Sequence, residues 1–296
     1  MNAQGAWRSG DTTRARITPV CGGKAILEEW AGTLHGSFMN GFSLRAYDPV
    51  RKDWDLLLFW TTDGNGGFGR LRGTFRHGRG EFFDRTDGLA RTRYSFSDGL
   101  SNSVRWDSAT TIDGGIAWKT DWIMEFSRTR AAAAVTQDAL FESEWTTGTV
   151  SPHAEARQLD GLLGVWAGTQ ITPEGDELEA RLRCKRLNKD CLILDLLETR
   201  APGSRDWDER LTVRGFESRT ASWAAWTVTE QDSTLRPSKG TLQGATMEFA
   251  REPEGGTRIM EWIDLSAADE IQIVQAIEQP DGTTSTTVTT LRPATR

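Results

Sequence analysis

The chain has 296 residues, enough for one large domain or two medium-sized domains that each bury a core. Its formal net charge is -7, which argues against a nucleic-acid partner and against an anionic membrane surface. Residues 1–10 are polar, and no apolar run approaches the length of a bilayer span. We therefore expect a cytoplasmic protein with no membrane partner.

Cysteine and histidine usage gives no sign of a metal or cofactor site. The three cysteines, Cys21, Cys184 and Cys191, are an odd number with no C-x-x-C pair, which argues against a disulfide framework or structural zinc. The histidines, His35, His77 and His153, fall in different kinds of predicted element without ligand spacing. We expect no metal, no haem and no other cofactor.

Short β-rich runs separated by turn residues dominate the first part of the chain. The run at 63–67, DGNGG, is typical of a hairpin turn rather than of a phosphate-binding loop. Strands that recur about every 8–12 residues with such turns between them are typical of a β-sandwich or β-barrel. The expected strands are 12–20, 25–30, 41–47, 54–62, 68–75, 81–85, 90–96, 102–108 and 116–126.

Residues 129–158 differ in composition and are predicted to be a linker. Ala131 to Ala134 and the stretch as far as Trp145 could form one short helix, and the residues from Thr146 to Pro152 resemble a loop.

A second unit is predicted from Leu159 to the end of the chain. It repeats, faintly, the spacing of the first: Trp60 precedes Gly73 by 13 residues, and Trp226 precedes Gly240 by 14. A Glu-Phe pair follows each glycine after 8 residues. The expected strands after an opening at Gly164 are 179–187, 191–199, 211–216, 221–229, 241–251, 257–265, 270–278 and 284–292.

The pattern predicts an all-β protein made of two tandem antiparallel up-and-down β-barrels. The domains are 1–128 and 159–296, joined by the linker 129–158. No long amphipathic helix lies between the strands, which argues against a parallel sheet. Closing each meander into a barrel would remove its exposed edges. The two barrels are expected to pair within the chain, and a homodimer is left open.

Thirteen tryptophans against two tyrosines indicate either thick barrel cores or an aromatic-lined cavity. A barrel of about eight strands can be filled by side chains or can hold one small ligand. The predicted lining residues of a cavity in the first unit are Trp30, Arg45, Trp60, Trp106 and Trp122.

Glu28 is the most informative acidic residue. With a period of two, Ile26, Glu28 and Trp30 share one face of a strand. If that face points inward, Glu28 is either a buried acid or base, or the partner of an inward arginine. Arg45 and Glu28 could orient the polar end of a mainly apolar ligand.

The stretches GGKAILEEWAG, GFSLRAYDPVRKDW, RYSFSDGLSNSVRW and DGGIAWKTDWIMEFSR resemble a bacterial family of uncharacterised calycin-like (lipocalin-like) domains. The likeness covers residues 5–128. Residues 159–292 match more weakly: their GVWAG opening looks like the Gly-x-Trp start of calycins, but the YDP turn is missing. The resemblance implies a closed β-barrel with an internal cavity, in tandem duplicate, and no particular activity.

Three functions fit these observations. The first is binding of a small hydrophobic or aromatic molecule in a barrel cavity. The second is a cofactor-independent isomerase, cyclase or lyase acting on a natural-product intermediate, with Glu28 or His35 as acid or base and Tyr47 as a hydrogen-bond donor. The third is a scaffold in which the second barrel only supports the first.

Overall fold

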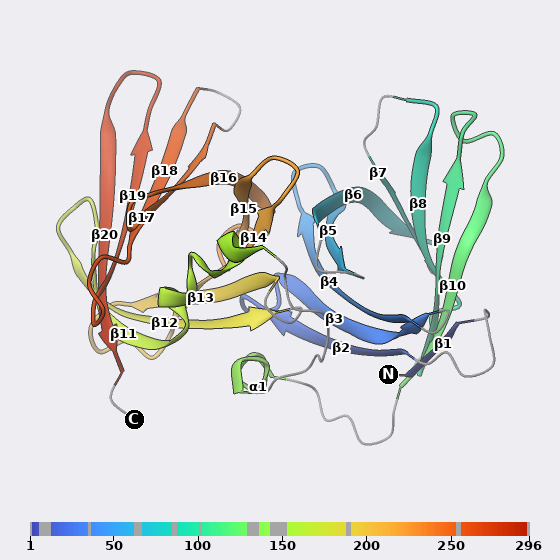
Figure 1. The fold of residues 1–296 in the computed structure, drawn as a ribbon, viewed down its shortest axis with the longest axis horizontal. Coiled ribbons are helices and arrows are strands. Elements are labelled where there is room, and N and C mark those ends of the chain that lie inside the picture. The colour runs from blue at the N-terminus through green and yellow to red at the C-terminus, as the bar shows by residue number, and fades with distance from the viewer. Residues whose placement is uncertain are drawn as a thin grey trace. The chain divides into compact units, whose positions relative to one another are not determined.

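The fold was analysed in a computed structural model that describes residues 2–5, 13–34, 37–61, 67–84, 88–100, 102–128, 136–142, 153–187, 191–252 and 256–294. The chain divides into two compact units, Met1–Val150 and Ser151–Arg296, and the boundary lies inside the predicted linker. Each unit contains one antiparallel sheet of ten strands that closes into a barrel (Figure 1).

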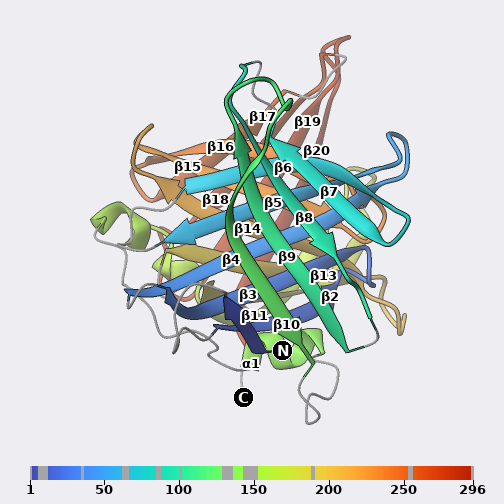
Figure 2. The same cartoon turned by 90° about the vertical axis from the view of Figure 1, so that its right-hand side faces the viewer.

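The first barrel follows the order of the chain from strand to strand. Its closing strand is β1, which pairs with β10 on one side and, through Asn2 and Ala3, with β2 on the other. Figure 2, which faces this barrel, shows β8, β9 and β10 side by side and inclined against β4 and β5, as expected for a twisted closed sheet. The strands are β1 (Asn2–Gly5), β2 (Thr13–Val20), β3 (Ala25–Leu34), β4 (Ser37–Asp48), β5 (Asp53–Thr61), β6 (Gly67–Arg76), β7 (Arg79–Asp84), β8 (Arg91–Ser97), β9 (Ser103–Thr111) and β10 (Lys119–Ser127).

The second barrel has the same meander and closes through the pairing of β11 with β20, from Trp166–Pro293 to Ile171–Val288. Its strands are β11 (Gly164–Ile171), β12 (Glu177–Leu187), β13 (Leu192–Arg200), β14 (Asp208–Glu217), β15 (Ser222–Thr229), β16 (Arg236–Gln243), β17 (Thr246–Arg251), β18 (Arg258–Asp264), β19 (Ile271–Glu278) and β20 (Thr284–Pro293).

The described helices lie between the barrels in the sequence. They are α1 (Gln137–Glu142), within the stretch predicted to hold one short helix, and the 3-10 turns η1 (Ala154–Arg157) and η2 (Asp160–Leu162). No helix in the described ranges is long and apolar enough to cross a membrane.

The all-β, up-and-down barrel prediction is confirmed, with ten strands in each barrel where lipocalins have eight. Two strand predictions are wrong in detail. The run 241–251 is a hairpin of β16 and β17, because Gly244 adopts a φ of +64° and turns the chain. β10 begins at Lys119 rather than at Ile116, because the Asp113 carboxylate accepts the backbone N–H groups of Ile116 and Ala117 and holds a loop.

The strand pairing of the two barrels repeats the spacing seen in the sequence, but the tryptophans that take part are not the ones that the sequence pattern indicated. Gly73 pairs with Phe82 on one side and with Trp54 on the other, and Gly240 pairs likewise with Phe249 and Trp223. Trp60 and Trp226 pair with other residues. Each barrel thus contains a row in which a glycine lies between a tryptophan and a phenylalanine. A Cβ at Gly73 would meet the backbone of Glu81 and one at Gly240 would meet the Phe249 ring, so neither position has room for a side chain.

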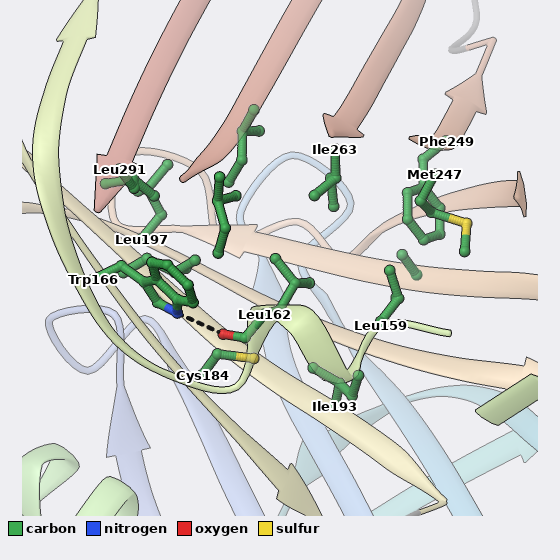
Figure 3. Close-up of a cluster of buried hydrophobic side chains, with 14 of the residues drawn as sticks. Leu159, Leu162, Trp166, Cys184, Ile193, Leu197, Met247, Phe249, Ile263 and Leu291 are labelled. Carbon is green, nitrogen blue, oxygen red and sulfur yellow. Dashed lines mark hydrogen bonds between the residues drawn. The ribbon is translucent and has the colours of Figure 1, made fainter. Parts of the chain in front are cut away.

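One end of the second barrel is closed by an apolar plug (Figure 3). Trp166 is buried, and its indole Nε1 donates a hydrogen bond of 2.9 Å to the carbonyl oxygen of Leu162 in η2. Leu159 and Leu162 belong to the same buried cluster as Ile263 and Leu291.

The β4–β5 turn of the first barrel is fixed by charge. Asp48 caps it by accepting the backbone N–H groups of Val50 and Arg51, each at 2.9 Å. Asp55, fully buried on β5, accepts hydrogen bonds from three arginines: Arg51 (2.8 Å), Arg70 (2.9 and 3.0 Å) and Arg72 (2.8 Å). Burial alone would raise the pKa of Asp55, but the hydrogen bonds and charges of these arginines hold that pKa below its ordinary value.

Substitution of Gly73 by alanine should destabilise the first barrel, because the new Cβ would lie 1.8 Å from the backbone oxygen of Glu81. We expect a loss of about 3 kcal/mol in the free energy of unfolding, measured by urea denaturation. Gly69→Ala, on the same strand and with nothing within 4 Å of its Cβ, is the control and should change stability by less than about 1 kcal/mol. Equal effects of the two substitutions would contradict the described register.

Asp55→Asn should lower stability at neutral pH by about 3 kcal/mol, because three guanidinium groups lose their shared acceptor. The depressed pKa means that the stabilisation is present above the unfolded pKa of about 3.9 and is lost as the pH falls through the folded pKa. Unfolding midpoints between about pH 5 and pH 2 should therefore fall more steeply for the wild type than for Asp55→Asn. Asp53→Asn, which loses a single contact to Arg51, should follow the wild-type curve.

Candidate functional site

A cavity inside the first barrel is the candidate site. Its volume is about 40 Å³, and its lining comes from strands β3, β4, β5, β8, β9 and β10. The lining combines a charged group with aromatic and aliphatic side chains. Lining residues include Glu28, Trp30, Ser43, Arg45, Phe96 and Trp106.

The charged group consists of Glu28 on β3 and two residues of β4. Glu28 Oε2 accepts a hydrogen bond of 2.9 Å from the Ser43 hydroxyl, and it also forms an ion pair with Arg45. The strand register explains why Glu28 contacts both residues. Glu28 pairs directly with Ser43, and Ile26, two residues earlier on the same face, pairs with Arg45. Of the two roles expected for Glu28, the structure shows the ion pair with an inward arginine.

The ion pair lies against aromatic rings. The Arg45 guanidinium stands 4.8 Å from the ring centre of Phe96, a cation–π geometry. Trp122 packs edge-on against Trp30 and against Trp106, each pair with 5.3 Å between ring centres. These contacts join strands β3, β9 and β10 across the interior, so the barrel offers mostly flat apolar surface to anything that enters.

Two polar atoms of this group have no partner among the described residues. Glu28 accepts from Ser43 and Arg45 at Oε2, which leaves Oε1 as an acceptor, and Arg45 Nε is buried without an acceptor. A buried donor without an acceptor costs free energy. A ligand with one polar end could satisfy both atoms, because it would offer an acceptor to Arg45 and a donor to Glu28.

The structure brings together five of the eight residues singled out from the sequence. Glu28, Trp30, Arg45 and Trp106 line the cavity, and Trp122 packs against its tryptophans. Tyr47 lies elsewhere, with 37% of its surface exposed and its ring against Trp54. His35 and the side chain of Trp60 fall outside the described residues.

Sequence reasoning missed several lining residues. Ser43 shares the inward face of β4 with Arg45, so the same period of two could have found it. Met124 shares the inward face of β10 with Trp122 and could have been found in the same way, whereas Phe96 lies on a strand whose phase the alternation alone left open. Leu56 and Leu58 lie in a run that is apolar on both faces, where periodicity cannot choose a side.

In its present form the cavity has room for a few water molecules, since each needs about 10–15 Å³. Sites for drug-sized ligands measure about 300–1,000 Å³, so a larger ligand requires some aromatic side chains to move. No group of three or more potential metal-ligating side chains occurs within the described ranges.

The fold and cavity define a protein of two tandem ten-stranded β-barrels, the first with an aromatic-lined interior. No family model matches the chain, and no curated protein matches it. Among solved structures, the chain is similar to a protein of unknown function of the DUF3598 family from Nostoc punctiforme PCC 73102. The match has 11% identity and a TM-score of 0.28, and it covers 87% of this chain and 89% of the other. A TM-score of this size does not establish a shared fold, so the fold rests on the strand pairing described above.

A double-mutant cycle on Glu28 and Arg45 should show strong coupling. Glu28→Gln and Arg45→Met should each lower the free energy of unfolding by about 2 kcal/mol, because each leaves a charge without its partner inside the barrel. The double variant should lose about 1–2 kcal/mol less than the sum of the two. The exposed pair Arg105 and Glu125, 3.5 Å apart in the same barrel, should couple by less than about 0.5 kcal/mol. Additive losses at Glu28 and Arg45 would contradict the ion pair.

Proposed function

We propose that the first barrel binds a small, mainly apolar or aromatic molecule that carries one polar end. The observation that carries this proposal is the Glu28–Arg45 pair, which stands inside an aromatic cavity and leaves Glu28 Oε1 and Arg45 Nε without partners among the described residues. A fixed polar pair in apolar surroundings orients a ligand, while the surrounding rings supply contact area.

Binding is favoured over catalysis by the positions of the candidate catalytic groups. Of Glu28, His35 and Tyr47, Glu28 is the one that the structure describes at the cavity, and it is held by Arg45 and Ser43. An acid–base reaction in the barrel would need a proton-transferring side chain available to the substrate, whereas Glu28 already accepts from Arg45 and Ser43. The cofactor-independent isomerase, cyclase or lyase therefore remains the second candidate.

The cytoplasmic location, the pairing of the two barrels and the homodimer stay predictions. The same holds for the expectation that the protein has no nucleic-acid partner. Size-exclusion chromatography with light scattering would decide the oligomeric state.

The direct test is native mass spectrometry of the protein purified from its source, followed by denaturing extraction. We expect a retained apolar molecule, and the extract should quench tryptophan fluorescence when it is added back to ligand-free protein. Trp106→Phe should reduce the amplitude of quenching, because Trp106 lines the cavity. Trp207→Phe is the control, since Trp207 packs against Arg181 and Arg200 in the second barrel.

The polar end is tested with the double variant Glu28→Gln/Arg45→Met. We expect its affinity for the extracted molecule to fall about tenfold, which corresponds to about 1.4 kcal/mol. The variant Arg105→Met/Glu125→Gln should bind like the wild type. An empty protein whose fluorescence no extract changes would overturn the proposal. Turnover of the molecule that disappears in Glu28→Gln while binding persists would favour the enzyme instead.

A further inference from the structure

The interior of the second barrel contains charge where the first contains aromatic rings. Its apolar cluster fills the end closed by Trp166 (Figure 3), and Phe249 belongs both to that cluster and to the lining of a separate cavity of about 30 Å³. Three arginines and several neutral polar residues line this cavity. Its lining includes Arg210, Thr227, Arg236, Ser238, Arg251 and Gln275.

The strand register places the arginines at the same end of the barrel interior. Arg210 and Arg214 share the inward face of β14 with Thr212, whose partners across the sheet are Asp195 and Thr227. Arg251 pairs with Ile259, which also lines the cavity together with Glu261. The arginines of β14, β16 and β17 therefore line one cavity inside the barrel.

Most of these charges are paired with each other. Arg214 is fully buried; its Nε lies 2.7 Å from Asp195, its Nη1 lies 2.9 Å from Glu261, and its guanidinium stands 4.7 Å from the ring centre of Phe249. Glu261 is also 3.0 Å from Arg210 Nη1. Although burial alone would raise the pKa of Glu261, Arg210 and Arg214 hold that pKa below its ordinary value. Each charge in this part of the network therefore lies within ion-pair distance of an opposite charge, although Arg214 Nη1 makes no hydrogen bond within the described part of the chain.

After this pairing, one cation of the cavity, Arg251, has no ion-pair partner within the described ranges. Asp195 and Glu261 balance Arg214 and Arg210, and Asp232 forms an ion pair with Arg236. No ion pair joins Arg251 to any residue in the described ranges. Burial, together with the charges of Arg236 and Arg210, outweighs the attraction of Glu261 and lowers the pKa of Arg251 to about 10, which still leaves it protonated at neutral pH.

The cavity also contains donors without acceptors. Arg210 Nε and Nη2 are buried and make no hydrogen bond within the described part of the chain. Together with Arg251 they form a concave group of N–H donors, with the hydroxyl groups of Ser238 and Thr227 on the same wall. Arginine forks of this kind match the geometry of carboxylate and phosphate oxygens.

We propose that the second barrel is a binding site for a small oxyanion, a carboxylate or phosphate group, held by Arg251 and Arg210. The anion would neutralise the remaining charge and accept the unpaired N–H groups. The volume fits an isolated anionic group or the anionic end of a longer molecule that enters from the polar end of the barrel. None of these residues lines the cavity of the first barrel, so each of the two binding proposals can be tested without the other.

The test uses the full chain and follows the thermal unfolding midpoint of the second barrel in sodium phosphate, sodium acetate or sodium chloride at equal ionic strength. A ligand that binds only the folded state raises the midpoint. We expect a rise of about 2–4 °C in phosphate or acetate relative to chloride. The anion with the larger effect identifies the ligand class, and isothermal titration calorimetry with the same salts gives the affinity.

Arg251→Met provides the decisive variant. It removes a half-buried cation that forms no ion pair within the described ranges, so its midpoint in chloride should equal or exceed that of the wild type, and its response to phosphate and acetate should vanish. Arg258→Met, an exposed arginine on neighbouring β18, is the control with the same change in net charge and should keep the full response.

Three outcomes would overturn the proposal. One is the absence of any rise in phosphate or acetate beyond that in chloride. Another is a full anion response in Arg251→Met. The third is a midpoint of Arg251→Met in chloride below that of the wild type, because this would show that the charge of Arg251 is already balanced in the folded barrel.

Discussion

A side chain that points into a closed β-barrel finds most of its partners inside the barrel, because little bulk water and no second layer of structure reach it. For apolar residues this constraint is satisfied by packing, and for charged residues it requires an opposite charge on a neighbouring strand. Glu28 meets Arg45 across one strand pair, and Arg214 meets Asp195 across another. The two interiors differ in how completely the constraint is met, and this difference distinguishes the two cavities.

The first barrel balances its inward charge and is otherwise aromatic. The second carries more arginines than carboxylates at one end of its interior. The same meander of ten strands therefore provides two chemically different chambers. A duplicated unit that keeps its backbone register, as the glycine rows at Gly73 and Gly240 do, can change the inward residues one at a time without losing the sheet.

The all-β class and the barrel meander follow from turn spacing, and the inward position of Glu28 follows from a period of two. The arginine-lined cavity of the second barrel could not be predicted from turn spacing or from a period of two. On β14, Leu211 and Val213 alternate with Thr212 and Arg214, and the apolar set would ordinarily be assigned to the barrel core. The register places Arg214 inside, where Asp195 on the neighbouring strand β13 and Glu261 on the distant strand β18 compensate for its charge. Such compensation depends on contacts that periodicity along one strand cannot reveal.

The up-and-down order also determines how each barrel can form. Every neighbouring strand pair except the closing one joins consecutive segments, so hairpins can form locally and early. Closure then brings together chain ends as distant as Asn2 and Ser127 in one unit, and Trp166 and Pro293 in the other. Loop-closure entropy grows only by about 0.6 kcal/mol for each doubling of loop length. Each barrel thus depends on a single long-range pairing, and the cost of that pairing in chain entropy rises only slowly with the length of the unit.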